Sequence, residues 1–252
     1  MRKPLFGMAL AGLLAGAPAM PAWGQGAFNM GMITNTNAIP ASTQSRAASS
    51  SIAGVLAAPG AVRSGGGLLS GFKGGAPVAG ANASYGYTPT AAIRKQTFDE
   101  FVARLKAKNP EAATAMQKAF AGHDYASIYQ GIVSPFGLKM NDLADSLTAY
   151  VVLGWMVSTG AGDPSPDSVR VARAQIAAAL ARDNRFSDPT LRAKVGEEFK
   201  LLFVTVHSGW LSARKEGNVD QYAKGVAQMF RTQTSLDLTG FTLGAAGFQR
   251  NG

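Results

Sequence analysis

Apolar residues recur with the period of an α-helix from about residue 93 to residue 230. Phe98, Phe101, Val102 and Leu105, for example, are spaced so that one helical face carries all four. Capping residues, prolines at first helical positions and glycines after last ones divide the region into segments. These signals predict seven helices, beginning near the capping box Thr97–Glu100, Pro110, Asp124, Asn141, Pro166, Pro189 and just after Asn218.

Two of these helices are apolar on almost every face, over residues 151–157 and 201–206. A helix that is apolar all round is a buried helix, so we expect these two at the centre. The tail, residues 235–252, is rich in glycine and is expected to be irregular or extended, packing back over the helices. The predicted fold class is all-α, an orthogonal or bundle-like packing of about seven helices over residues 93–252 with two central buried helices.

A different composition precedes this helical domain. Residues 25–92 are dominated by glycine, alanine and serine, and acidic residues are absent before Asp99. Such a segment has too little apolar surface to offset the entropy of an ordered chain, so we predict a disordered leader. Tyr85 and Tyr87, near its end, are the place where the chain is expected to dock onto the folded part.

The first 24 residues have the three parts of a secretory signal peptide. Arg2 and Lys3 are followed by an apolar run, and Ala22-Trp23-Gly24 supplies small residues for cleavage before Gln25; cleavage after Ala19 is the alternative. The apolar run is shorter than the ~20 residues of a spanning helix and is broken by glycine and proline. We therefore expect a periplasmic or secreted protein with no membrane span in the mature chain.

Charge and cysteine content narrow the range of functions. The net charge of +9 is spread over the signal segment, the leader and the domain, and all 15 acidic residues lie between Asp99 and Asp237. Bases such as Arg170, Arg173 and Arg182 are interpreted as a solvated face, and no nucleic-acid partner is expected. The absence of cysteine excludes disulfides, thiol catalysis and thiolate metal sites.

A set of soft helical motifs resembles an uncharacterised family of exported bacterial proteins. The likeness spans residues 87–180 and includes Tyr87-Thr-Pro-Thr90, Gly137-Leu138, Asn141-Asp-Leu-Ala-Asp145, Tyr150, Trp155 and Arg173-Ala-Gln175-Ile176. Members of that family carry a signal peptide, a low-complexity leader and a helical domain of unknown function. The resemblance implies a localisation and a fold, and it implies no activity.

Acidic pairs are the first candidates for chemistry. Asp142 and Asp145 share one face at the start of a helix, where they could bind a cation or share a proton. The alternative is that they cap the helix and complement its dipole. Glu197 and Glu198 are interpreted as part of a solvated face.

Aromatic residues and histidines complete the candidate set. Trp155 and Trp210 fall on the two buried helices, where a core role competes with stacking against a ligand. His123 is expected in a loop, and His207 is expected to be partly buried and bonded to backbone. The spacing of these residues gives no metal or cofactor motif, and His207 and Ser208 point about 100° apart on a helix, so they do not form a nucleophile and its base.

Three functions remain open at this point. The first is a non-enzymatic helical module that binds an envelope or extracellular protein or glycan. The second is a hydrolase of envelope glycan or peptide that uses carboxylates from separate helices. The third is a structural component that assembles through its leader. A polar cleft with two convergent acids would favour the second, and a sealed helical bundle would favour the first.

Overall fold

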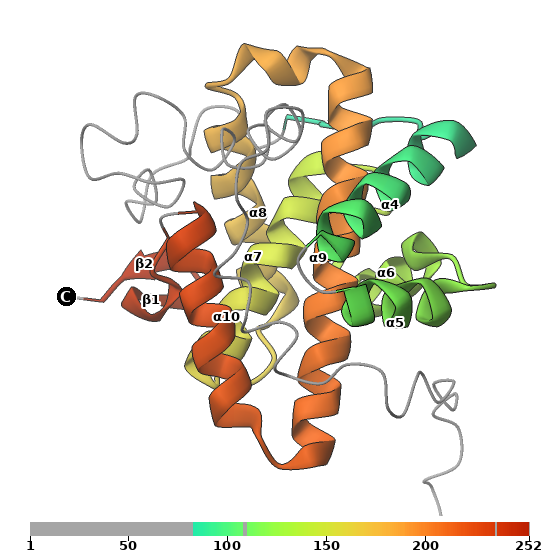
Figure 1. Ribbon diagram of the computed structural model, residues 1–252. Helices are drawn as coiled ribbons and strands as arrows, with labels where there is room; N and C mark the ends of the chain where they lie inside the picture. Colours follow the sequence, from blue (N-terminus) through green and yellow to red (C-terminus); the bar gives the residue numbers. More distant parts are fainter. Residues whose placement is uncertain (1–82, 108–109, 235, 252) are drawn as a thin grey trace, which may run out of the picture.

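The computed structural model describes residues 83–107, 110–234 and 236–251, and the predicted signal peptide and most of the predicted leader lie outside them. The described chain forms seven α-helices and one small β-hairpin (Figure 1). The helices are α4 (Ala91–Lys106), α5 (Pro110–Phe120), α6 (Tyr125–Val133), α7 (Leu143–Thr159), α8 (Pro166–Leu180), α9 (Pro189–Glu216) and α10 (Val219–Thr234). The all-α fold class and the seven helices are confirmed.

Local capping explains most of the helix boundaries. Asp124, Asp142, Ser165 and Asp188 each accept a hydrogen bond from a free amide of the helix they precede. Helices α7 and α9 end at glycines in the left-handed conformation, where a residue with a Cβ would be strained.

The predicted start of the first helix is wrong. Helix α4 begins at Ala91, because the side chain of Thr90 accepts the amide of Ile93 at 3.1 Å and caps it there. Thr97 lies inside the helix with its side chain buried, so the capping box is not used. The helical period of the apolar residues correctly predicted a helix here. Thr90 and Thr97 could each have capped its first turn, and the prediction chose the wrong one.

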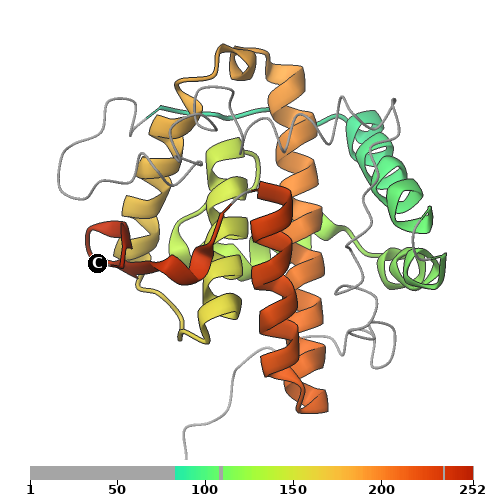
Figure 2. The ribbon, with the colours of Figure 1, turned by 60° about the vertical axis from the view of Figure 1, so that its left-hand side comes forward.

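Helix α7 lies at the centre of the domain, and every residue from Leu143 to Val157 is buried. Helix α7 packs most extensively against α9, and α10 packs against both α7 and α9 (Figure 2). Gly154 allows the closest approach, since Phe230 of α10 packs directly against its backbone. The predicted burial of residues 151–157 and 201–206 is confirmed, although Leu202 and Thr205 are only partly buried.

The C-terminal tail packs back on the helices as a hairpin. Strands β1 (Phe241–Gly244) and β2 (Gly247–Arg250) pair antiparallel and lie against α8 (Figure 1). The side chain of Gln175 accepts the amide of Phe248 at 2.9 Å and donates to its carbonyl at 3.2 Å. The indole of Trp155 donates to the carbonyl of Phe241 at 2.9 Å. These bonds supply partners for backbone groups that would otherwise be buried alone.

A short strap, residues 83–90, joins the domain ahead of α4. Tyr85 and Tyr87 are buried in the main core, as the prediction of a docking point there expects. The backbone of Tyr87 donates to Asn141 at 3.0 Å, and that of Leu143 donates to Tyr85 at 3.1 Å. Packing therefore begins before residue 93, which was the predicted start of the domain.

In the described part of the chain, none of the helices combines the length and the unbroken apolar character that crossing a bilayer requires.

We predict that Gly154→Ala destabilises the domain by about 1–3 kcal/mol, because the new methyl group would overlap the ring of Phe230. Gly131→Ala in α6 is the matched control. It meets no other atom within 4 Å, and removing a helical glycine should stabilise the protein by about 0.5–1 kcal/mol. Urea unfolding measures both changes, and equal effects of the two substitutions would contradict the close packing at Gly154.

Candidate functional site

The predicted acid pair lies at the start of α7, and its oxygens bond to the protein itself. Asp142 is the N-cap of the helix, and one of its oxygens accepts the amide of Asp145 at 3.2 Å. Its other oxygen accepts the amide of Tyr85 in the strap at 2.9 Å. Asp145 accepts the amide of Lys139 at 2.7 Å. The capping interpretation therefore describes these residues, and both are buried.

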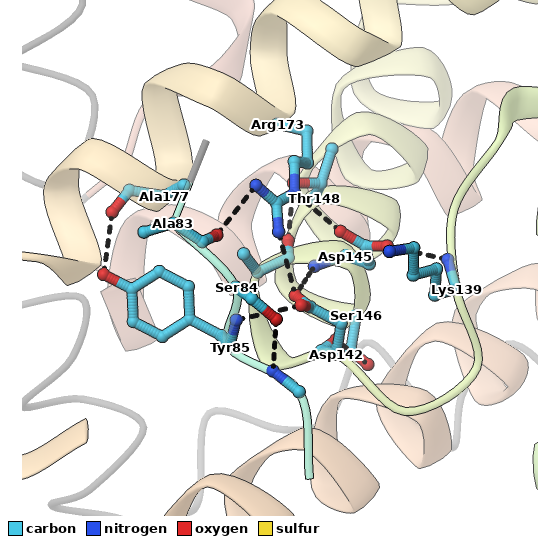
Figure 3. Close-up of polar contacts among 12 residues, drawn as sticks. Ala83, Ser84, Tyr85, Lys139, Asp142, Asp145, Ser146, Thr148, Arg173 and Ala177 are labelled. Atoms are coloured by element: carbon cyan, nitrogen blue, oxygen red, sulfur yellow. Dashed lines mark hydrogen bonds and ion pairs between the residues drawn. The ribbon is translucent and has the colours of Figure 1, made fainter. Parts of the chain in front are cut away.

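Arg173 of α8 joins the two carboxylates (Figure 3). Its Nε donates to Asp145 at 2.7 Å and one terminal nitrogen donates to Asp142 at 3.3 Å. The other terminal nitrogen donates to the carbonyl of Ala83 at 3.1 Å. The solvated role predicted for Arg173 is wrong, because the fold turns this residue inward while Arg170 and Arg182 remain exposed.

The electrostatics of this cluster follow from its burial. Burial raises the pKa of Asp145, and the Arg173 guanidinium and the Lys139 amide act in the opposite direction. Burial is the largest single effect on Arg173 and opposes its charge, but the hydrogen bonds and charges of Asp145 and Asp142 together outweigh it, and the pKa of Arg173 is raised. The guanidinium of Arg173 binds both carboxylates, so these three residues form a structural ion cluster, which we call the lock.

A second buried cluster surrounds Glu197 of α9, which the sequence had placed on a solvated face. Its carboxylate accepts bonds from the hydroxyls of Tyr87 at 3.2 Å and Tyr125 at 2.8 Å. Lys200 forms an ion pair with it at 2.6 Å, and neither side chain is exposed to solvent. Burial lowers the pKa of Lys200, while Glu197 acts to raise it. The solvated interpretation failed because α4, α6 and the strap all cover this face of α9.

Glu198, the next residue, is also buried and ties α9 to α4. It pairs with Arg104, and Lys194 pairs with Glu100 at 3.1 Å across the same contact. Burial raises the pKa of Glu198 to about 7, with Arg104 opposing the shift and Glu100 adding to it. The raised pKa of Glu198 therefore belongs to a structural contact between α9 and α4, in which Arg104 is its partner.

The apolar cavity of this domain lies on another side of α7. It has a volume of ≈ 90 Å³ and is enclosed by the end of α6, the second half of α7, the start of α8 and one face of α9. The α9 residues are Phe203, His207 and Trp210, and Asp163 lies at the mouth. Trp210 is only partly buried, so the cavity reaches the surface of the described domain.

His207 is the polar side chain inside this cavity. Its ring stacks on Phe203, with centroids 6.0 Å apart and planes inclined by 10°, and the ring centroid of Trp210 lies 6.1 Å away, with the planes inclined by 62°. No residue in the described ranges forms a hydrogen bond with the ring, so the predicted backbone bond is not found. Burial lowers the pKa of His207.

The four predicted site residues thus separate into three places. Asp142 and Asp145 meet in the lock, Trp155 packs under the hairpin, and Trp210 lines the cavity. The sequence was interpreted as making His207 a partly buried residue bonded to backbone, and a metal ligand or a catalytic base was weighed against that. Its spacing from Phe203 and Trp210, which places all three on one helical face, is the sequence signal that could have identified the cavity. Within residues 83–251, as far as described, no three metal-binding side chains gather at one point.

Comparison with known proteins gives a family and no activity. A family model described as a family of unknown function (DUF6683) matches residues 3–246, nearly the whole chain. No curated protein and no solved structure matches the chain.

We predict that Arg173→Leu destabilises the domain by about 3–5 kcal/mol at pH 7, because two buried carboxylates lose their guanidinium. Arg170→Leu on the same helix removes an exposed ion pair with Asp167 and should cost less than about 1 kcal/mol. Urea unfolding at pH 7 and pH 5 measures the difference, which should shrink at pH 5 because burial raises the pKa of Asp145 and favours its neutral form as pH falls. A pH-independent loss would show that packing, and not charge, is responsible.

The raised pKa of Glu198 predicts a pH dependence with a definite sign. A carboxyl with a raised pKa contributes stability that is present below its unfolded pKa of 4.5 and is lost as pH rises through about 7. Glu198→Gln should therefore become more stable than the native protein as pH rises from 5 to 8, by up to about 3 kcal/mol. Unfolding curves across this range test it, with the exposed Glu111→Gln as control. If Glu198→Gln instead lost stability relative to the native protein between pH 5 and pH 8, the raised pKa of Glu198 would be refuted.

Proposed function

The chain belongs to the family of unknown function DUF6683, and we propose that it is an exported, non-enzymatic helical module that binds an envelope or extracellular partner. The observation that carries the proposal is the apolar cavity beside α9, which reaches the surface at Trp210 and Asp163. Concave, apolar sites with a few polar groups are the usual form of a binding site.

The buried carboxylates are all engaged in ion pairs and hydrogen bonds within the protein, which supports a binding function over hydrolysis. A glycosidase needs two carboxyl groups that face the substrate from opposite sides of a cleft. Here Asp142 and Asp145 are held by Arg173, and Glu197 is held by Lys200 and two tyrosines. The strap covers the first of these clusters, and the cavity is lined by apolar side chains instead.

The surface next to the cavity favours a protein partner over a glycan. Leu211, one helical turn beyond His207, is the large apolar side chain that the described domain leaves most exposed. The guanidinium of Arg214 lies over the ring of Trp210, 5.0 Å from its centroid. Tryptophan and arginine next to exposed aliphatic surface are typical of the energetic centres of protein interfaces.

Export is the part of the proposal that rests on the sequence. Residues 1–24 supply a charged start, an apolar run and a small-residue cleavage pattern. Removal of these residues would leave residues 25–82, the part of the predicted leader (25–92) that precedes the strap, where they would tether the domain to an envelope surface.

The test places a photo-crosslinking amino acid at Leu211 in the full-length chain, produced in its native cells. We expect the chain to be recovered outside the cytoplasm with its new terminus at Gln25, and to give one discrete adduct after irradiation. The same probe at the exposed Lys95 of α4 should give none.

A cavity-filling variant makes the test specific. Ala149→Leu adds three carbons to the cavity wall and should abolish the adduct at position 211 while leaving the melting transition intact. An adduct that persists in this variant would show that the partner does not use the cavity. Recovery of the intact chain from the cytoplasm would contradict export.

A further inference from the structure

A primary amine, a carboxylate and a carboxamide meet between the start of α7 and the middle of α9. The Nζ atom of Lys200 lies 2.6 Å from Oε1 of Glu197, and it donates a hydrogen bond to Oδ1 of Asn141 at 3.2 Å. The side chains of Lys200 and Glu197 are 0% exposed, and Asn141 is partly buried. In chemical terms these groups are a nucleophile, a proton carrier and an electrophile, which together are the reactants and the catalyst of an amide transfer.

The strap holds all three groups in place. The ring centroids of Tyr87 and Tyr129 lie 5.4 Å and 6.0 Å from the Nζ atom of Lys200. The hydroxyl of Tyr87 donates to Glu197 at 3.2 Å, and its backbone amide donates to the carbonyl oxygen of Asn141 at 3.0 Å. The aromatic rings keep water away from the amine, so an attack on the amide competes with less hydrolysis than it would at a surface.

The amine is close to the carbon atom that it would attack. A carbonyl bond is ~1.23 Å long, so Cγ of Asn141 lies within about 4.4 Å of Nζ of Lys200. Reacting atoms in a near-attack geometry are ~3–3.5 Å apart, and a shift of about 1 Å in either side chain closes the difference. The lysine side chain has four rotatable bonds through which it can move.

Burial favours the form of the lysine that can react. It lowers the pKa of Lys200, while the charge of Glu197 acts in the opposite direction. Only the neutral amine is a nucleophile. Transfer of a proton from Lys200 to Glu197 leaves two neutral groups, so it is less unfavourable in this enclosed site than in water.

We propose that Lys200 and Asn141 form an intramolecular amide bond between Nζ and Cγ, with Glu197 as the catalytic residue that carries the proton. Glu197 accepts a proton from the lysine ammonium, and the neutral Nζ attacks Cγ to form the new bond. Through Glu197, a proton passes from Nζ to Nδ2 of Asn141; the Cγ–Nδ2 bond breaks and ammonia leaves. In sum, an ammonium group and a carboxamide become a secondary amide and an ammonium ion, so no oxidant, reductant or further reactant is consumed.

The bond would join the two helices that pack most extensively on each other. Asn141 and Lys200 are 59 positions apart in the chain, at the start of the central helix α7 and in α9. A cross-link of this span restricts the unfolded chain, as a disulfide does, in a sequence that has no cysteine. Arg94, whose Nε lies 3.6 Å from Oε2 of Glu197, remains as a cation beside the carboxylate after the lysine loses its charge. The proposal does not depend on what binds in the cavity.

The mass of the native chain tests the bond. The purified full chain should weigh about 17 Da less than its sequence, the mass of the ammonia that leaves. Cyclisation of a terminal Gln25 would remove the same mass, so a tryptic digest locates the loss. We expect residues 140–170 and 195–214 in one branched peptide that is not cleaved after Lys200, because trypsin requires a free lysine side chain. Recovery of peptides 140–170 and 195–200 as separate species at the masses of their sequences would overturn the proposal.

Three variants assign the roles of the groups. Asn141→Ala removes the electrophile but keeps the ion pair of Lys200 with Glu197, and Glu197→Gln removes the proton carrier. Both should lose the branched peptide completely. Glu198→Gln is the matched control, since the carboxylate of Glu198 pairs with Arg104 instead, and it should form the bond to the same extent as the native chain. A branched peptide at native yield in Glu197→Gln would overturn the catalytic role of Glu197. The native chain gives the decisive measurement, so the test stands even where a variant fails to fold.

Discussion

The guanidinium of Arg173 is the interaction on which the arrangement of the domain depends. It comes from α8, pairs with two carboxylates at the start of α7, and bonds to the backbone of the strap at Ala83. Each of the three guanidinium nitrogens of Arg173 donates to one of these partners, and this pairing offsets the cost of burying the charges. Removing Arg173 would leave two buried carboxylates without their common cation. The cluster therefore fixes which part of the chain can lie at the start of the central helix.

The domain uses its buried charges for structure and keeps its cavity apolar. Arg173, Lys200 and Arg104 each hold carboxylates that join one helix to another element. The cavity on the other side of α7 is lined mostly by apolar side chains, with the partly buried ring of His207 among them. The acids that the sequence offered for chemistry, Asp142 and Asp145, are therefore buried in ion pairs away from this cavity.

The sequence predicted the helices well because their boundaries are local. Asp124, Ser165 and Asp188 cap the helices they precede, and Gly217 ends α9. The buried charges could not be predicted in the same way, since whether Glu197 faces water depends on α4, α6 and the strap, which are distant in the sequence. The same limit applies to His207, whose surroundings come from four separate elements. Only the i, i+4 and i+7 spacing of Phe203, His207 and an aromatic residue at 210 is local, and it marks a shared face without showing that the face is hollow.

The strap has a mechanical consequence for the proposal that the residues before it tether the domain. Any force on the residues before Ala83 passes first to the carbonyl of Ala83 and the amide of Tyr85, which are held by Arg173 and Asp142. The load therefore reaches the ion cluster before it reaches a helix end. Tyr85 anchors the strap a second time, through its hydroxyl on the carbonyl of Ala177 at 3.1 Å. A domain held in this way would resist being pulled open through the predicted leader, because the chain enters the domain at a buried ion cluster.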